Sequence, residues 1–151
     1  MTNRPAADAG PDARLRTMRI LWAVFLVCIG QFFLVGWVTR PEADWSAAGV
    51  GGLSPVLYAA ALLGLAAVAA SFAVKGTFFR RAAETQEPAR MQTGFIVAMV
   101  LCEVAALMGL VALFVTLSKY AYLLFALGAL GQALHFPRRD EVLSAYYKPA
   151  G

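Results

Sequence analysis

The chain has 151 residues, of which 60% are hydrophobic and only 15% are charged, and its formal net charge is +4. So few polar side chains could not cover the surface of a soluble domain of this size, and the long apolar stretches indicate a membrane protein. The small positive charge gives no reason to expect a nucleic-acid partner, which usually requires a strongly basic surface.

Residues 1–16 are rich in Ala, Asp, Pro and Arg, and they are predicted to form a disordered N-terminal tail. A transmembrane domain is expected over residues 17–137. Its first two apolar runs are about 20 residues long, which at about 1.5 Å per residue matches a hydrocarbon core of about 30 Å. The fold class is therefore an all-α membrane protein. Its four expected transmembrane helices cover about residues 19–39, 55–75, 93–118 and 119–136.

Basic side chains gather on one side of the predicted membrane topology. They precede the first helix, separate the second from the third, and follow the fourth: Arg14, Arg16, Arg19, Lys75, Arg80, Arg81, Arg90, Arg138, Arg139 and Lys148. The two loops on the other side carry only Arg40 and Lys119. The positive-inside rule then places both termini and the central loop in the cytoplasm. We expect a multi-pass protein of a bacterial inner (plasma) membrane, with residues 138–151 as a cytoplasmic tail against lipid head groups.

Glu103 is the only charged residue in the apolar run of residues 94–118, and it lies near the middle of that run. A carboxylate at this depth costs about 2.5–3.5 kcal/mol on insertion scales unless it is protonated, paired or exposed to water. Glu103 is therefore the main candidate for a functional residue.

Small side chains recur at helical spacing in the second and third predicted helices. Such stripes allow close approach of helix backbones in lipid, so these two helices are predicted to pack as a tight hairpin with Glu103 on the side away from the contact. The candidate packing residues are Gly64, Ala67, Ser71, Gly94, Ala98, Ala105 and Gly109.

Other chemical groups are few. The sequence has no phosphate-binding loop and no cluster of metal ligands, and its single histidine, His135, is expected at the membrane interface. Cys28 and Cys102 are interpreted as apolar packing residues, and Gln31 and Gln132 as donors of interhelical hydrogen bonds. We therefore predict no soluble-type catalytic site, no cofactor and no metal, and the question of enzymatic activity stays open.

Residues 55–118 resemble the c subunit (proteolipid) of rotary ATP synthases. The similar elements follow one another in order: a helix of small residues over 64–73, a polar loop Arg-Arg-Ala-Ala-Glu-Thr-Gln-Glu-Pro over 80–88, and the carboxylate stretch Leu-Cys-Glu-Val-Ala-Ala-Leu-Met-Gly-Leu-Val over 101–111. The resemblance implies that the second and third helices form a c-like hairpin in which Glu103 binds a proton. It also implies a homo-oligomeric ring, a partner subunit that carries an arginine, and a stalk contacted by Arg80, Gln86 and Pro88.

Two other interpretations stay open. Four short helices with one membrane carboxylate also look like small multidrug resistance proteins, which are proton-coupled transporters, although that family carries its glutamate in the first helix. Alternatively the chain is a structural or accessory subunit of a membrane complex, in which Glu103 pairs with Gln31, Gln132 or a partner's basic group. A carrier exposes Glu103 to lipid or to a partner, a transporter exposes it to a water cavity, and a scaffold satisfies it internally.

Overall fold

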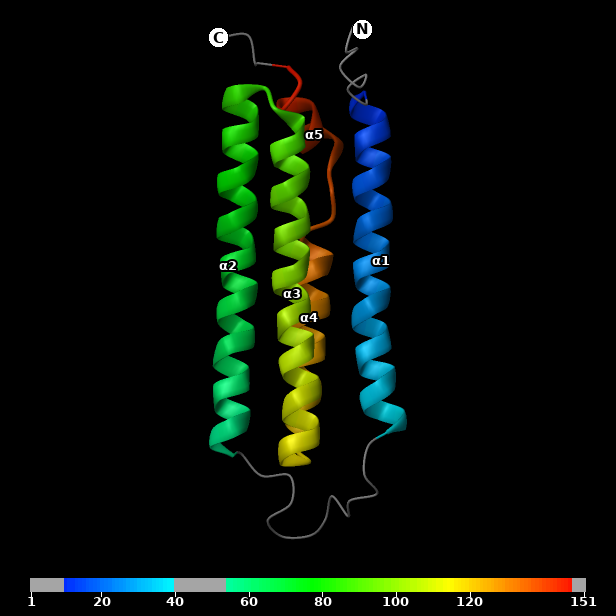
Figure 1. The fold of residues 1–151 in the computed structure, drawn as a ribbon, viewed down its shortest axis with the longest axis vertical. Coiled ribbons are helices and arrows are strands. Elements are labelled where there is room, and N and C mark those ends of the chain that lie inside the picture. The colour runs from blue at the N-terminus through cyan, green and yellow to red at the C-terminus, as the bar shows by residue number, and fades with distance from the viewer. Residues whose placement is uncertain (1–9, 40–53, 148–151) are drawn as a thin grey trace, which may run out of the picture.

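The computed structural model describes residues 10–39 and 54–147, and this part of the chain is helical and contains no strand. The elements are α1 (Pro11–Val38), α2 (Pro55–Thr85), α3 (Pro88–Thr116), a 3-10 turn η1 (Lys119–Ala121), α4 (Tyr122–Leu134) and α5 (Arg139–Ser144). Figure 1 shows α1 to α4 side by side as an elongated bundle, with the short α5 at one end. The predicted all-α class is confirmed.

A proline stands at the start of each of the three long helices, namely Pro11, Pro55 and Pro88. Proline is favoured there because the first amide of a helix has no intrahelical partner and the ring presets a helical φ angle. Ser54 adds a side-chain cap to α2, since its Oγ accepts a hydrogen bond from the Leu57 amide at 3.2 Å. These local signals determine where the helices begin.

The first helix begins earlier than the sequence predicted. Residues 11–16 were expected in a disordered tail, but they form the first turns of α1. Residues 1–9, the rest of that expected tail, lie outside the described residues. The N-terminal end of α1 therefore extends the bundle beyond the predicted start at residue 19.

The helices α1, α2 and α3 are long and apolar enough to cross a membrane. The fourth predicted span, over residues 119–136, is divided into η1 and the 13-residue α4. At about 2.0 Å per residue for a 3-10 turn and about 1.5 Å for an α-helix, these two elements together measure about 26 Å. This is slightly less than the hydrocarbon thickness of a typical bilayer.

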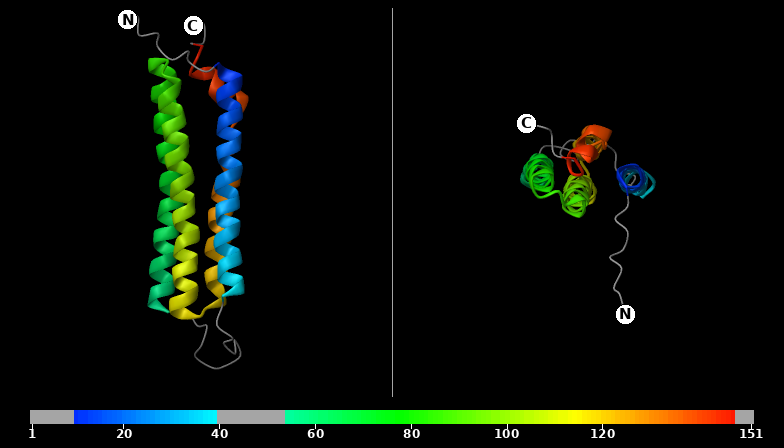
Figure 2. Two further views of the ribbon diagram at one scale, coloured as in Figure 1. Left: turned by 45° about the vertical axis from the view of Figure 1, so that its right-hand side comes forward. Right: turned by 90° about the horizontal axis from the view of Figure 1, so that it is seen from above.

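The helix α3 is the most enclosed element, because α2, α4 and α1 all pack on it. Seen along the bundle axis, α3 and α4 lie between α2 and α1 (Figure 2). The four predicted packing residues of α3, Gly94, Ala98, Ala105 and Gly109, are all buried. By contrast, α1 buries only a few side chains and presents many large apolar ones outward. The α2–α3 hairpin is thus the tightest part of the fold.

The beginning of α1, the turn between α2 and α3, and α5 lie at the same end of the bundle (Figure 1). We call this the basic end, because it contains the described basic residues of the predicted cytoplasmic side. The opposite end contains η1 and the last turn of α1. The grouping agrees with the charge pattern of the sequence.

The C-terminal residues are more structured than predicted. Residues 138–151 were expected to form a tail at the membrane surface, but residues 139–144 form α5, which packs across the basic end. Val142 and Ala145 are each only 1% exposed, and they share an apolar cluster with Met18 of α1. Arg14 Nε also donates a hydrogen bond to the Tyr146 hydroxyl at 3.0 Å. The C-terminal segment therefore links α1 to the rest of the bundle.

Candidate functional site around Glu103

Glu103 is partly buried on the face of α3 that lies toward α1. Its Oε1 atom is buried and has no hydrogen-bond partner among the described residues. The side chain of Cys28, on α1, lies close to the carboxyl group. A thiol is only a weak donor, so this contact does little to stabilise a negative charge.

The surroundings of Glu103 are apolar. Ala106 and Leu110 follow Glu103 on the same face of α3, at intervals of one and two turns. Both belong to an apolar cluster in which Ile29 of α1 packs with Phe125 of α4. A carboxyl group among apolar side chains costs least when it is neutral, because such neighbours solvate an ionised form poorly.

The glutamines Gln31 and Gln132 do not pair with Glu103 in the described structure. Gln31 is exposed on the surface of α1. Gln132 is fully buried, and its main-chain oxygen accepts a hydrogen bond from Trp22 Nε1 at 2.8 Å. However, both polar atoms of the Gln132 side chain are buried without a partner among the described residues. The hydrogen-bonding role predicted for these side chains is therefore not observed within the bundle.

A second polar contact connects α2 to the end of α4. The Ser71 hydroxyl donates to the main-chain oxygen of Val68 at 2.6 Å, and its Oγ lies 2.8 Å from His135 Nε2. Since the single hydroxyl proton is used for Val68, the imidazole Nε2 is assigned as the donor to Ser71. His135 is only 1% exposed. Sequence reasoning placed it at the interface and missed this contact, because the position of α4 relative to α2 has no signal in the sequence.

The predicted packing residues lie in helix contacts, but not all in the same one. Gly64 faces α3, and a Cβ atom there would lie 3.4 Å from the Cα of Ala105. A Cβ atom at Gly109 would lie 3.1 Å from the main-chain oxygen of Ala121, in η1. Gly94 packs against Phe78 of α2. The small side chains therefore serve contacts of α3 with both α2 and the η1–α4 segment.

Ala98 is fully buried, whereas Ala67 is only half-buried. The sequence analysis did not identify the close-packed glycines Gly36, Gly128 and Gly131. A Cβ atom at Gly128 of α4 would lie 2.8 Å from the main-chain oxygen of Cys102, so Gly128 permits the close approach of α3 and α4. A usable signal was the pair Gly128 and Gly131, which lie three positions apart on one helix face.

The three loop residues have different roles in the structure. Gln86 ends α2 in the left-handed conformation, with φ of 54°, and its side-chain amide donates to the main-chain oxygen of Ala83 at 2.7 Å. Pro88 is buried at the first position of α3. Only Arg80 is exposed in the manner required for contact with a partner. Gln86 and Pro88 mainly build the turn between the two helices.

The described residues contain no group of three or more His, Cys, Asp or Glu side chains that could hold a metal ion. Comparisons with protein-family models, with curated proteins and with solved structures found no match.

Proposed function

We propose that this chain is an integral membrane protein in which Glu103 reversibly binds a proton within the bilayer, in the way that the resemblance to the c subunit of rotary ATP synthases implies. The observation that supports this most is the buried Oε1 atom of Glu103, which has no partner among the described residues. An unpaired carboxylate in hydrocarbon costs several kcal/mol, whereas a protonated carboxyl group avoids most of this cost. Protonation thus accounts for the retention of an acidic side chain at this position.

Release of the proton requires a cation or a water path beside the carboxyl group. On α3 itself, the basic residue Arg90 is about 20 Å from Glu103 along the helix axis, and the Lys75 side chain of α2 is paired with Glu141. The nearest polar side chain that contacts the carboxyl group is the Cys28 thiol. We therefore propose that a second copy of the chain or another subunit of a membrane complex brings a basic group or a water path to Glu103.

In the proposed topology, the basic end faces the cytoplasm and η1 with α4 forms a fourth, short span. The orientation follows from the positive-inside rule. The length of about 26 Å for η1 and α4 fits a bilayer that thins locally by a few ångströms, which is a modest cost. A bacterial inner membrane is the proposed location.

The α2–α3 hairpin supports the c-like comparison, because small residues allow the two helices to approach closely and the turn carries Gln86 and Pro88. The position of α1 limits the comparison with the c subunit. Since α1 lies against one side of the partly buried Glu103, a partner can approach the carboxyl group only from the side that α1 leaves open. This packing of α1 favours, as a second candidate, an accessory subunit in which the Glu103 face is covered by α1 permanently.

A small transporter is less well supported. The aromatic-lined groove between α1 and α4 has a volume of about 320 Å³ and includes Phe33, Tyr122 and Phe125. Its lining does not include Glu103. The aromatic groups and the carboxylate therefore do not form a common pocket for a cationic substrate.

The test is the reaction of Glu103 with dicyclohexylcarbodiimide in native membranes, read by mass spectrometry across a pH series. This apolar reagent modifies protonated carboxyl groups that are accessible from lipid. The exposed Glu84, outside the apolar segment, provides an internal control, and the Glu103→Gln variant identifies the labelled position. Selective labelling of Glu103 that decreases as the pH rises supports the proton carrier. Absence of labelling at every pH overturns it and favours the accessory subunit.

A further inference from the structure

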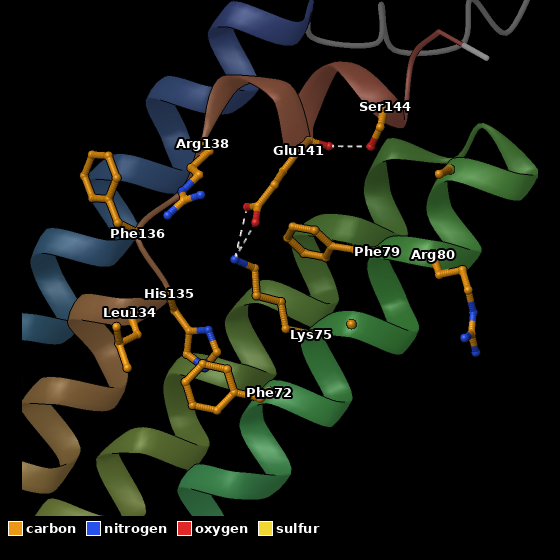
Figure 3. A pocket seen from close by; sticks show the side chains of 12 residues that line it. Phe72, Lys75, Phe79, Arg80, Leu134, His135, Phe136, Arg138, Glu141 and Ser144 are labelled. Carbon is orange, nitrogen blue, oxygen red and sulfur yellow. Dashed lines mark hydrogen bonds and ion pairs between the residues drawn. The ribbon is translucent and has the colours of Figure 1, made fainter. Parts of the chain in front are cut away.

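A cavity of about 560 Å³ opens at the basic end, between α2, the residues that follow α4, and α5. Its size falls within the range of about 300–1,000 Å³ that is typical of small-molecule sites. Figure 3 shows its lining side chains, which include the aromatic rings of Phe72, Phe79 and Phe136 and the charged groups of Lys75, Arg138 and Glu141. The cavity thus combines an apolar wall with a charged wall.

The charged wall has an excess of positive charge. Lys75 Nζ lies 3.1 Å from Oε1 and 3.0 Å from Oε2 of Glu141, so these two side chains neutralise each other. Arg138 has no ion-pair partner within the described part of the chain. In Figure 3 its side chain extends into the space between Phe136 and Glu141, whereas that of Arg80 points away from the other lining residues. Arg138 is therefore the cation available to a ligand in this cavity.

The apolar wall continues onto the outer surface of the bundle. Leu134 is 62% exposed, and Phe72 and Phe136 are each more than 40% exposed. In a membrane these side chains contact lipid, and Arg138 follows them directly at the basic end. The cavity consequently lies where hydrocarbon meets the head-group layer, with its cation on the side of the head groups.

We propose that this cavity binds the phosphate-bearing head group of an anionic phospholipid. The guanidinium of Arg138 contacts the phosphate, because its planar fork can donate two parallel hydrogen bonds to phosphate oxygens. The acyl chains lie against Leu134 and Phe72. Basic pockets on the cytoplasmic side of transmembrane helices commonly recognise anionic head groups, and the adjoining apolar surface favours a lipid over free phosphate. This proposal does not depend on proton binding by Glu103.

The test uses the full chain, purified in detergent and analysed by native mass spectrometry with added phosphatidylglycerol, phosphatidylcholine or inorganic phosphate. The Arg138→Gln variant removes the proposed ligand. The Arg81→Gln variant makes the same change of charge at an exposed arginine outside the cavity lining. Circular dichroism verifies that both variants keep the helical content of the wild type.

We expect the wild type to retain phosphatidylglycerol in preference to phosphatidylcholine, and inorganic phosphate not to displace it. Arg138→Gln should weaken phosphatidylglycerol binding by about tenfold, the expected effect of losing a charge-assisted hydrogen bond, whereas Arg81→Gln should change it by less than about twofold. Equal effects of the two variants would show that only the net charge matters and would overturn the proposal. Equal retention of both lipids, or displacement by inorganic phosphate, would also overturn it.

Discussion

The contact between α3 and α4 at Gly128 should tolerate no added side chain. A Cβ atom at this position would lie 2.8 Å from the main-chain oxygen of Cys102 and 3.3 Å from the main-chain nitrogen of Ala106. Both neighbours are backbone atoms of a helix, so they cannot rotate away as a side chain could. The Gly128→Ala substitution therefore has to push α4 away from α3.

The expected size of this effect follows from the cost of overpacking, which is typically about 1–3 kcal/mol in well-packed interiors. Gly30 offers a matched control, because it is also a helical glycine in an apolar segment but has nothing within 4 Å of a Cβ atom placed on it. The Gly30→Ala substitution should change the free energy of unfolding by less than about 1 kcal/mol, in the direction of greater stability, since alanine favours helix.

The free energy of unfolding can be measured by titrating the protein from mild detergent micelles into sodium dodecyl sulfate, with helical content followed by circular dichroism. We expect Gly128→Ala to lower it by about 1–3 kcal/mol relative to the wild type. Equal effects of Gly128→Ala and Gly30→Ala, or a stabilising effect of Gly128→Ala, would contradict overpacking of the α3–α4 contact at this position.

Three further predictions use the same titration. Glu141→Gln should lower the free energy of unfolding by about 1–3 kcal/mol, because the Lys75 side chain is only 12% exposed and loses its partner, and an unchanged value would contradict this. Ser71→Ala should lower the free energy of unfolding by about 1–3 kcal/mol, because the buried His135 ring nitrogen loses its hydrogen-bond acceptor. A decrease no larger than that expected from the lost volume of the hydroxyl group would contradict this role of the hydrogen bond. Gln86→Val should lower the free energy of unfolding by about 1–2 kcal/mol, because a β-branched residue is strained at φ of 54°. Gln86→Gly should lower it less, since glycine adopts this conformation without strain. The reverse order of the two variants would refute the assignment of strain.

The packing face of α3 could be predicted from spacing alone. A period of 3.6 residues places Gly94, Ala98, Ala105 and Gly109 on one side of a helix, and the structure buries all four. The pattern could not identify the neighbour of each residue. Gly109 lies on the hairpin face but also contacts η1 and α4. This second contact depends on where the chain returns after Thr116, which the spacing does not show.

Shorter elements were harder to predict. Pro11 and the acidic Asp12 are recognisable signals of a helix start, and they could have moved the beginning of α1 into the predicted tail. By contrast α5 has six residues, too few for a helical period to be visible, and only Val142 and Ala145 show that it has a buried face. Its docking depends on contacts with α1 that are remote in sequence.

The environment of Glu103 was only partly predictable. Its place near the middle of an apolar run follows from the sequence, and so does its position outside the small-residue stripe. That Cys28 and α1 cover it depends on the register between α1 and α3, for which neither helix carries a distinctive pattern. Two helices with uniformly apolar surfaces can pack in several registers, so their contacts can be identified only from the three-dimensional structure.

Reversible protonation of Glu103 is the central claim, and infrared difference spectroscopy of the protein in lipid vesicles tests it most directly. The difference between spectra at low and high pH should contain the carbonyl band of a protonated carboxylic acid in an apolar setting, and this band should be absent from the Glu103→Gln variant. A band that persists in Glu103→Gln, or a wild-type spectrum in which no such band changes with pH, would contradict the account.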